Sequence, residues 1–378
     1  MTVGWYVHHH GAGHLARLRA VAPSLPGVVA LSSLEPVDPP CPWIVLPRDD
    51  GAAPEDPTAG GTLHWVPRGH AGLRDRMARL ASWIAEARPS AFVVDVSVEV
   101  AVLARLLGVP TVVIVQRGRR DDAPHALAYA QAAAIAAPWT AVTHAPESAL
   151  PAGRLHFCGA LSRLDGVLFT PRSAGGDVAL LLGAGGHGVT APDVSAAAAA
   201  TPDRRWHVAG PLRCTGPGVV DHGPHADIAA LLERCSVVVG SAGGNVVAEV
   251  AAARRAFVCL PQDRPFSEQE EQAAALARLG VAEVRASWPA AGAWPETLAA
   301  AEARELSRWG ALHDGHGARR LADVVARVAA GAGAGATAGA TAGGGCRGSS
   351  ANDPPAGSVE LEPPRFAPVT ARATRPRS

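Results

Sequence analysis

The stretch that decides the fold is Gly240–Asn245, with the sequence GSAGGN, which separates an apolar run from a helical pattern. Val237–Gly240 is continuously apolar, as a buried strand is, and Asn245–Ala253 has the composition of a helix. Small residues between a strand and a helix let the backbone turn sharply and bring its amides close to a ligand. Because a helix N-terminus favours negative charge, this loop predicts a phosphate or diphosphate site.

Two further glycine loops follow predicted strands in the same way. Gly11 and Gly13 lie between the strand Val3–His8 and the helix Leu15–Ala22, and the segment 183–188 reads GAGGHG. The chain contains no Lys, so neither loop is a P-loop. The second segment matches G-x-G-x-x-G, but the strand that follows it lacks the acidic residue of a dinucleotide site. We therefore expect Gly185 and Gly186 to receive a diphosphate.

Apolar strands alternate with helical patterns through residue 330, which is typical of parallel sheets covered on both faces. The series restarts after the polar stretch Ser162–Gly176. The sequence predicts an α/β fold of two doubly wound domains, 1–165 and 166–330, that face each other across a cleft. The Gly/Ala/Pro/Arg-rich segment 331–378 lacks apolar periodicity, which predicts a disordered tail. The predicted helices include His125–Ala136 and most of Leu298–Val328.

Composition excludes several classes of protein. The 34 basic and 34 acidic residues balance, which argues against broad nucleic-acid binding. No apolar run reaches the length of a membrane span, and the N-terminus does not resemble a secretory signal. The six cysteines form no C-x-x-C pair, which favours reduced thiols over a zinc site. We expect a cytoplasmic protein, and the sequence leaves open a peripheral contact with the inner membrane face.

Beyond Gly240–Asn245, the chain continues through Ala248–Ala252, Phe257–Pro261 and Phe266–Ala273. This succession resembles the carboxyl-terminal domain of GT-B glycosyltransferases, and it is most similar to the MurG-type group, glycosyltransferase family 28. The segment Gly11–His14 resembles that family's glycine loop ending in histidine. The resemblance spans about residues 1–330. It implies a GT-B fold with a donor-binding carboxyl domain and an acceptor-binding amino domain.

The resemblance also implies roles for individual residues of the donor site. Glu249 would accept hydrogen bonds from the ribose hydroxyls, and Glu268 with Gln269 would hold the hydroxyls of the sugar. Gln272 stands where MurG-type enzymes usually carry Asn. Arg264 could neutralise the leaving phosphate, although a surface role fits it as well. The residues expected beside the donor diphosphate are Gly243, Gly244 and Asn245.

His14 is the candidate general base, because an imidazole titrates near neutrality and this loop follows a strand at the predicted cleft. Asp95 ends a strand of the same predicted sheet and could orient the imidazolium, or it could instead cap the next helix. Strand alternation puts His8 and His10 on one side, where His14 could complete a metal site. The resemblance implies a metal-free reaction, and no D-x-D motif follows a strand, so we expect no metal and no cofactor.

These features together predict an inverting glycosyltransferase that uses a nucleotide-sugar, UDP-linked by preference, and an acceptor hydroxyl. The acceptor could be a lipid-linked or cell-envelope glycan intermediate or a small natural product. Arg117, Arg119 and Arg120 follow a strand at the predicted cleft and could hold an acidic acceptor, or form a solvated cluster. The alternatives are a non-hydrolysing nucleotide-sugar epimerase of the same fold and a non-catalytic protein that binds nucleotide-sugars.

Overall fold

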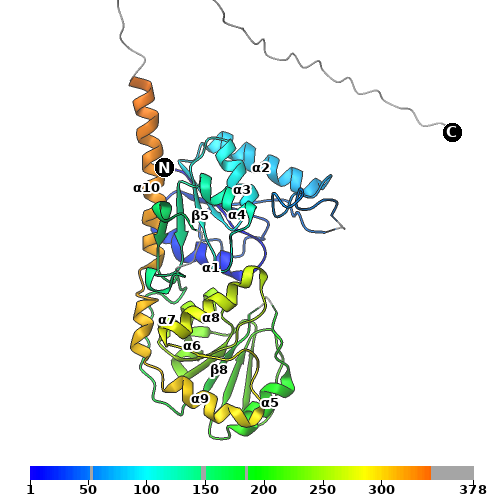
Figure 1. Ribbon diagram of the computed structural model, residues 1–378, viewed down its shortest axis with the longest axis vertical. Helices are drawn as coiled ribbons and strands as arrows, with labels where there is room; N and C mark the ends of the chain where they lie inside the picture. Colours follow the sequence, from blue (N-terminus) through cyan, green and yellow to red (C-terminus); the bar gives the residue numbers. More distant parts are fainter. Residues whose placement is uncertain (52–53, 146–149, 184–185, 342–378) are drawn as a thin grey trace, which may run out of the picture. The chain divides into compact units, whose positions relative to one another are not determined.

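The computed structural model describes residues 1–51, 54–145, 150–183 and 186–341, which form two parallel sheets, each with helices on both faces (Figure 1). The strands of the first sheet are β1 (Val3–Tyr6), β2 (Val28–Ser32), β3 (Trp43–Val45), β4 (Ala91–Asp95), β5 (Thr111–Ile114), β6 (Ala134–Ala137) and β7 (Leu155–Phe157). Those of the second sheet are β8 (Val178–Leu181), β9 (Trp206–Ala209), β10 (Val219–Gly223), β11 (Val237–Gly240), β12 (Ala256–Cys259) and β13 (Glu283–Val284).

Helices connect successive parallel strands, as in a doubly wound fold, and the predicted fold class is confirmed. They are α1 (Ala12–Val21), α2 (Ala71–Ala87), α3 (Val98–Leu106), α4 (Ala123–Gln131), α5 (Ala191–Ala200), α6 (Ile228–Arg234), α7 (Gly244–Ala253), α8 (Glu268–Leu279), α9 (Trp294–Glu302) and α10 (Gly317–Thr341).

Strand order brings the glycine loops to the middle of each sheet. The first sheet has the order β3-β2-β1-β4-β5-β6-β7, and the second has β10-β9-β8-β11-β12-β13, with every pairing parallel. β1 pairs with β4, where Tyr6 lies opposite Val94, and β8 pairs with β11, where Leu181 lies opposite Gly240. Because parallel strands end at the same edge, the loop after β1 lies next to Asp95.

Both faces of each sheet are buried, which explains the continuous apolar strands. In β1, Trp5 belongs to the core on one face of the first sheet, and Tyr6 to the core on the other. In β11, Val238 and Val239 divide in the same way between the two cores of the second sheet. Successive side chains of a strand point to opposite faces, so a strand with both faces covered is apolar at most positions.

The last helix departs from the predicted domain division, which placed 317–330 in the carboxyl-terminal domain. The apolar face of α10 instead completes the core of the first sheet around Trp5 and Val93. Its buried residues there are Leu321, Ala322, Val324, Val325 and Ala329. An amphipathic pattern shows that a face is buried but not which core buries it. α10 runs to Thr341, and residues 342–378 of the predicted tail lie outside the described residues.

The predicted helix His125–Ala136 is wrong at its carboxyl end. α4 ends at Gln131, and Ala134–Ala137 forms β6 between β5 and β7. The sequence of this segment is rich in Ala, which has the highest helix propensity. All four residues of β6 are buried, so packing inside the sheet overrides the local preference.

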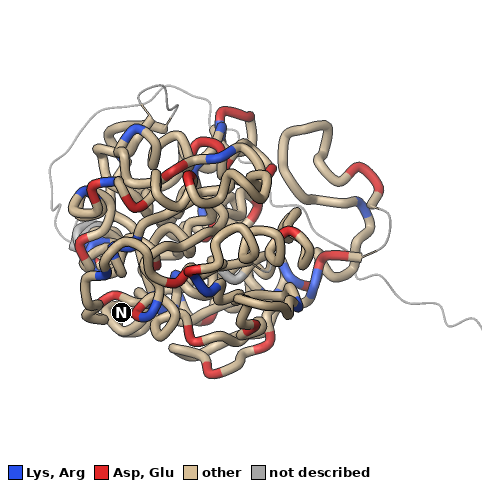
Figure 2. The backbone as a smooth tube through the Cα atoms, turned by 90° about the horizontal axis from the view of Figure 1, so that it is seen from below, with Lys and Arg blue, Asp and Glu red and all other residues tan. Residues whose placement is uncertain are grey.

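No helix among the described residues is long and apolar enough to cross a membrane. Acidic and basic positions are interspersed along the backbone in the view of Figure 2. Neither observation contradicts the sequence-based expectations of no membrane-spanning helix and no broad nucleic-acid binding.

The packing of α10 can be tested by truncating one of its buried side chains. We expect Leu321→Ala, at a side chain that is 1% exposed, to lower the free energy of unfolding by about 2–5 kcal/mol. The control, Arg319→Ala, changes an exposed position of the same helix and should stay within about 0.5 kcal/mol of wild type. Urea unfolding measures both. Equal stability of the two variants would show that α10 does not complete this core.

Candidate functional site

The loop between β1 and α1 positions His14. β1 is fully buried, and the chain leaves it through Val7 and three histidines before Gly11, the N-cap of α1. Gly11 has φ +88°, a conformation that glycine adopts without strain. His14 follows in the first turn of α1, where its side chain is buried.

His14 and Asp95 meet at the edge where β1 and β4 end. His14 Nδ1 lies 3.0 Å from Asp95 Oδ1, and the Asp95 carboxylate is fully buried. The carboxylate thus faces the Nδ1 side of the ring, although the contact does not have the angles of a well-directed hydrogen bond. Val96, directly after Asp95, has φ +69°, which is strained for a β-branched residue. Strain of this kind collects at functional sites, where the surrounding structure enforces it.

Arg17 is the third member of this group. It lies one turn after His14 on α1, and its Nη1 contacts both oxygens of Asp95, at 2.6 Å for Oδ2. Burial would raise the pKa of Asp95, but the charges of Arg17 and His14 outweigh it and hold the pKa at about 2. Asp95 is therefore an anion at neutral pH, and it fixes both side chains.

His8, the first of the histidines before Gly11, lies against His14. The rings of His8 and His14 are 5.7 Å apart, and burial, with the neighbouring histidines adding to it, lowers the pKa of His8 to about 3. His8 is thus neutral at physiological pH. His8, His10 and His14, the predicted metal-binding set, do not bring three ligand atoms together. Among the described residues, the groups that do are His9 with His10 and Asp50, and His64 with Asp122 and His125.

The loop between β11 and α7 has the predicted form. Gly243 is the N-cap of α7, and no side chain caps the first turn of α7 or of α1. A Cβ added at Gly13 would lie 3.8 Å from Asn245 Oδ1, so the two helix starts approach each other. Each of these helix starts has first-turn N–H groups that no side chain caps and a positive dipole end. Arg17, Asn245 and Gln272 line a small cavity of about 50 Å³ there.

Glu249 is buried on α7, and its carboxylate Oε1 accepts a hydrogen bond from Arg163 Nε at 2.7 Å. Burial raises the pKa of Glu249, and the charge of Arg163 partly offsets this. The Arg163 side chain is 53% exposed and comes from the segment between the two sheets. A ribose would have to share Glu249 with this guanidinium or displace it.

Gln269 and Glu268 begin α8 beside the same loop. Gln269 is buried, and its Oε1 accepts a hydrogen bond from the backbone N–H of Gln262 at 2.9 Å. A Cβ at Gly243 would lie 3.8 Å from Gln269 Nε2, which places this amide next to the start of α7. Glu268 Oε2 lies 3.9 Å from Arg120 Nη2. Gln272, one turn on, faces the small cavity that Asn245 lines.

The third glycine loop is described in part. Gly186 has φ +93°, and Gly185 lies outside the described residues. Arg264 Nη2 donates a hydrogen bond to the Gly186 carbonyl at 2.9 Å, which joins this loop to the segment before α8. Gly186, Gly240 and Ser241 line one further small cavity at this strand edge.

Arg117 is occupied by structural contacts. Its guanidinium donates to the Thr143 carbonyl and hydroxyl, each at 2.7 Å, and lies over the Trp139 ring. Burial, with a smaller effect of Arg278, lowers the pKa of Arg117 to about 10. These contacts leave it little freedom to hold an acceptor. It does line a cavity of about 750 Å³ that Arg119, Asp121, Trp139 and Glu270 also border.

A contact between the loop 116–120 and the start of α8 was not predicted. Arg119 N–H donates to the Phe266 carbonyl at 2.7 Å, and Gly118 N–H donates to Glu271 Oε2 at 3.0 Å. Phe266 and Ser267 both have positive φ, 64° and 52°. A side chain at Gly118 would meet the Phe266 carbonyl at 2.4 Å. Only glycine fits there.

No protein-family model matches the chain, and no curated protein matches it in sequence. Solved structures do match. The glycosyltransferase of kitacinnamycin is 17% identical, with a TM-score of 0.63 over 86% of this chain and 98% of that chain. Acinetobacter baumannii MurG is 14% identical, with a TM-score of 0.59 over 86% of this chain and 100% of that chain. Phytolacca americana UGT2, solved with UDP-2-fluoro-glucose and pterostilbene, is 16% identical, with a TM-score of 0.54 over 88% and 94%.

The chain has the GT-B fold. The likeness covers nearly the whole of each solved structure and includes both sheets. In the GT-B fold of this chain, the three glycine loops lie at the carboxyl ends of central strands, where open parallel sheets bind ligands.

Three contributors to the site were missed by sequence reasoning. Arg17 carries a signal, since it stands three residues after His14 and a helix brings such residues to one face. Arg163 and Phe266 carry none, because their partners lie far away in the sequence.

The buried carboxylate of Asp95 predicts that the free energy of unfolding depends on pH in the acid range. The pKa of Asp95 in the folded protein, about 2, is below that of an unfolded aspartate, about 3.9. Asp95 therefore stabilises the fold fully above about pH 4, and this contribution is lost as the pH falls toward 2. We expect the gap in unfolding free energy between wild type and Asp95→Asn to be constant above about pH 5 and to shrink below pH 4.

Urea unfolding at a series of pH values measures this gap. Asp203→Asn, at an exposed aspartate, serves as the control and should stay within about 0.5 kcal/mol of wild type. A gap that persists unchanged at pH 2 would contradict the pairing of Asp95 with Arg17 and His14.

Proposed function

We propose that this protein is an inverting glycosyltransferase that moves a sugar from a nucleotide-sugar, UDP-linked by preference, to an acceptor hydroxyl. The observation that carries the proposal is the approach of the α1 and α7 N-termini, with His14 in the first turn of one and Asn245 in the first turn of the other. A diphosphate between them would meet two positive dipole ends and two sets of N–H groups that no side chain caps.

The donor side of the proposal is assembled from α7 and α8. Gly243, Gly244 and Asn245 would bind the diphosphate, and Glu249 would accept hydrogen bonds from the ribose. Glu268 and Gln269 would hold the sugar, next to the loop that would bind the phosphates. The complex of Phytolacca americana UGT2 with UDP-2-fluoro-glucose supports a uridine nucleotide, by analogy of fold.

The acceptor side would be the amino-terminal sheet and the large cavity beside the loop 116–121. Its volume, about 750 Å³, is within the range of about 300–1,000 Å³ that is usual for small-molecule sites. Trp139 separates this cavity from the small one that Arg17 and Asn245 line. We favour a small natural product as the acceptor, with a lipid-linked glycan intermediate as the alternative.

The reaction follows from this arrangement as one displacement. Asp95 favours the tautomer of His14 that carries a proton on Nδ1, which leaves Nε2 free to accept the proton of the acceptor hydroxyl. The acceptor oxygen attacks the anomeric carbon as the bond to the diphosphate breaks, and the configuration inverts. The nucleoside diphosphate leaves toward the helix N-termini, which stabilise its developing charge. The solved structures reported above are not epimerases, and nothing in the site favours the epimerase alternative.

The role of His14 can be tested by removing its ring. We expect His14→Ala to lower the rate of transfer by about 10²–10⁴-fold, because a positioned base contributes that much, while the affinity for the nucleoside diphosphate stays unchanged. His225→Ala, at an exposed histidine between β10 and α6, is the matched control. Product analysis with a UDP-sugar and a panel of acceptors measures transfer. Undiminished transfer by His14→Ala would eliminate it as the base.

The donor site can be tested without knowing the acceptor. We expect UDP to bind the wild type in isothermal titration calorimetry, and Glu249→Gln to weaken binding about tenfold or more, since a hydrogen bond to a charged group contributes about 1.5–3 kcal/mol. Glu296→Gln, at an exposed glutamate of α9, should bind as wild type does. A thermal-shift screen with UDP, dTDP and the corresponding nucleotide-sugars tests which nucleobase the site accepts. Absence of binding by all of these nucleotides would reject the proposed function.

A further inference from the structure

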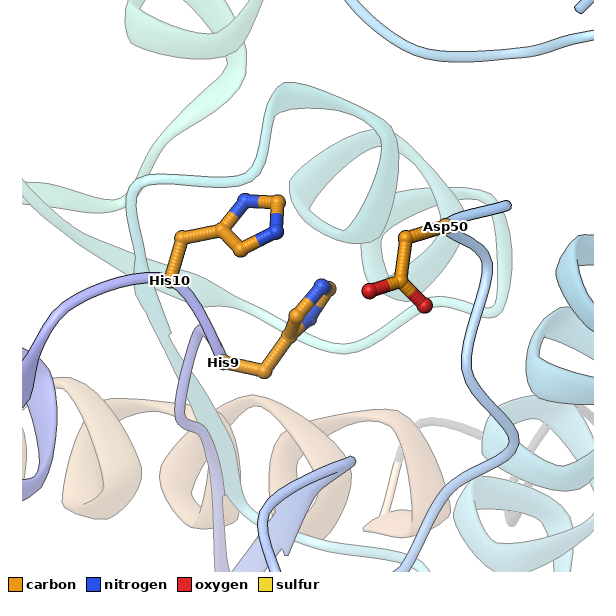
Figure 3. Close-up of side chains that lie close together, drawn as sticks. All are labelled: His9, His10 and Asp50. Atoms are coloured by element: carbon orange, nitrogen blue, oxygen red, sulfur yellow. The ribbon is translucent and has the colours of Figure 1, made fainter. Parts of the chain in front are cut away.

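Three consecutive histidines after β1 form a cluster that the proposed transfer reaction does not use. The rings of His8 and His9 stack with centroids 4.9 Å apart, and those of His9 and His10 are 4.1 Å apart. Asp50, from the segment after β3, lies beside them (Figure 3). One ring nitrogen of His9, one of His10 and one carboxylate oxygen of Asp50 all lie within 4.8 Å of one another.

We propose that His9, His10 and Asp50 bind one divalent transition-metal ion of the Zn²⁺ class, with water completing its coordination. Two imidazoles and a carboxylate are ligands that zinc and its neighbours in the first transition series accept, whereas magnesium and calcium prefer oxygen ligands alone. In tetrahedral zinc sites, ligand atoms stand about 2.0–2.2 Å from the metal. His10 and Asp50 are exposed, so small side-chain rotations can bring the three atoms to that distance.

A second observation comes from His9 itself. Its side chain is only 3% exposed, and its Nε2 is a buried polar atom with no hydrogen-bond partner in the described part of the chain. Buried polar atoms in native proteins normally have a partner, so this atom requires an explanation. Figure 3 shows the His9 ring extending from the loop toward the side where the Asp50 carboxylate lies. The carboxylate oxygen Asp49 Oδ1 lies 3.9 Å from this nitrogen, too far for a hydrogen bond, and a bound cation would give the imidazole a direct partner.

Two arginines lie close enough to oppose a cation, and each has a carboxylate partner. Arg76 Nη1 lies 2.9 Å from Asp49 Oδ2, and its Nη2 is 3.4 Å from His9 Nδ1. Arg48 Nε donates to Asp50 at 2.9 Å. The two arginines and two aspartates together carry no net charge. The Arg48–Asp50 pair is exposed, so it contributes little and can yield to a metal ion.

A second histidine cluster, formed by His64, Asp122 and His125, is less suited to a cation. Asp122 sits between His64 and His125, and its two oxygens already contact one ring each, with Oδ2 2.7 Å from His64 Nε2. Arg120 Nη1 lies 3.1 Å from His125 Nε2 and puts a positive charge on that side. The ligand atoms of this cluster therefore have partners, which makes it a matched control for the first.

The proposed ion would join two segments that the sequence separates. His9 and His10 belong to the loop that leads into α1, which carries His14, and Asp50 belongs to the segment after β3. Bound metal would limit the motion of the loop without touching the reacting atoms. None of its ligands has a role in the proposed transfer, so the site stands independently of that function.

The test uses the full chain without a histidine tag, dialysed against chelator, in a reducing buffer that keeps the thiols from oxidation. Zn²⁺ is titrated in competition with a coloured chelator, and metal content after gel filtration gives the stoichiometry. We expect one Zn²⁺ per chain, a raised melting temperature, and no binding of Mg²⁺ at the same concentration. His10→Gln and Asp50→Asn should each weaken zinc binding by about tenfold or more, whereas His64→Gln should not.

The ligand substitutions are at exposed positions, so the variants should fold, and their melting temperatures without metal check this. Failure of the wild type to bind Zn²⁺ would overturn the proposal. So would zinc binding that survives both ligand substitutions, or that is lost in His64→Gln. These readouts involve no transferase activity, so their failure leaves the proposed function untouched.

Discussion

A buried carboxylate at the end of β4 constrains the whole amino-terminal site. Asp95 is fully buried and ionised, and a charge in that position is tolerated only when it is paired and hydrogen-bonded. Both partners come from one turn of α1, His14 and Arg17. The loop before α1 must therefore close tightly enough to deliver that turn to the strand edge. Gly11, with its positive φ, makes this possible. The position of the candidate base thus follows from the need to pair one carboxylate.

The same placement brings the start of α1 to the start of α7. The chain has no Lys, so a diphosphate would have to be recognised by backbone N–H groups, helix dipoles, histidine or arginine. Two N-termini that no side chain caps, and that meet at Gly13 and Asn245, provide such groups without a flexible side chain. Arg17 adds a fixed positive charge, although Asp95 already neutralises it. Recognition would then depend on backbone geometry more than on net charge.

Sequence patterns predict those features of the fold that depend on short stretches of the chain. The strands that flank the glycine loops, the loops themselves, and the placement of His14 and Asp95 at one sheet edge all follow from hydrophobic runs and from the geometry of parallel strands. β6 was predicted as helix because Ala favours helices, while its burial between two strands decides the outcome. The core that α10 joins depends on the tertiary fold.

The side-chain contacts that sequence patterns did not predict join residues far apart in the sequence. Glu249 is paired with Arg163, 86 positions away, and no local pattern marks that pairing. Arg117 follows a strand at the expected edge, yet its guanidinium turns to Thr143 and Trp139. A basic residue near a cleft indicates where charge is available. Whether it faces a ligand depends on which polar groups the fold leaves closer to it.

The loop 116–120 shows how such a partnership can control a site from a distance. Its backbone holds the carbonyl of Phe266 and the carboxylate of Glu271, at the point where two residues in the left-handed region bend the chain into α8. A pair of non-glycine residues in that region is costly and persists only if other contacts enforce it. The Arg120 guanidinium and the His125 ring against the Phe266 side chain supply further contacts. The first turn of α8, which carries Glu268 and Gln269, therefore takes its direction from the amino-terminal half, so the placement of the donor sugar would depend on residues that never touch it.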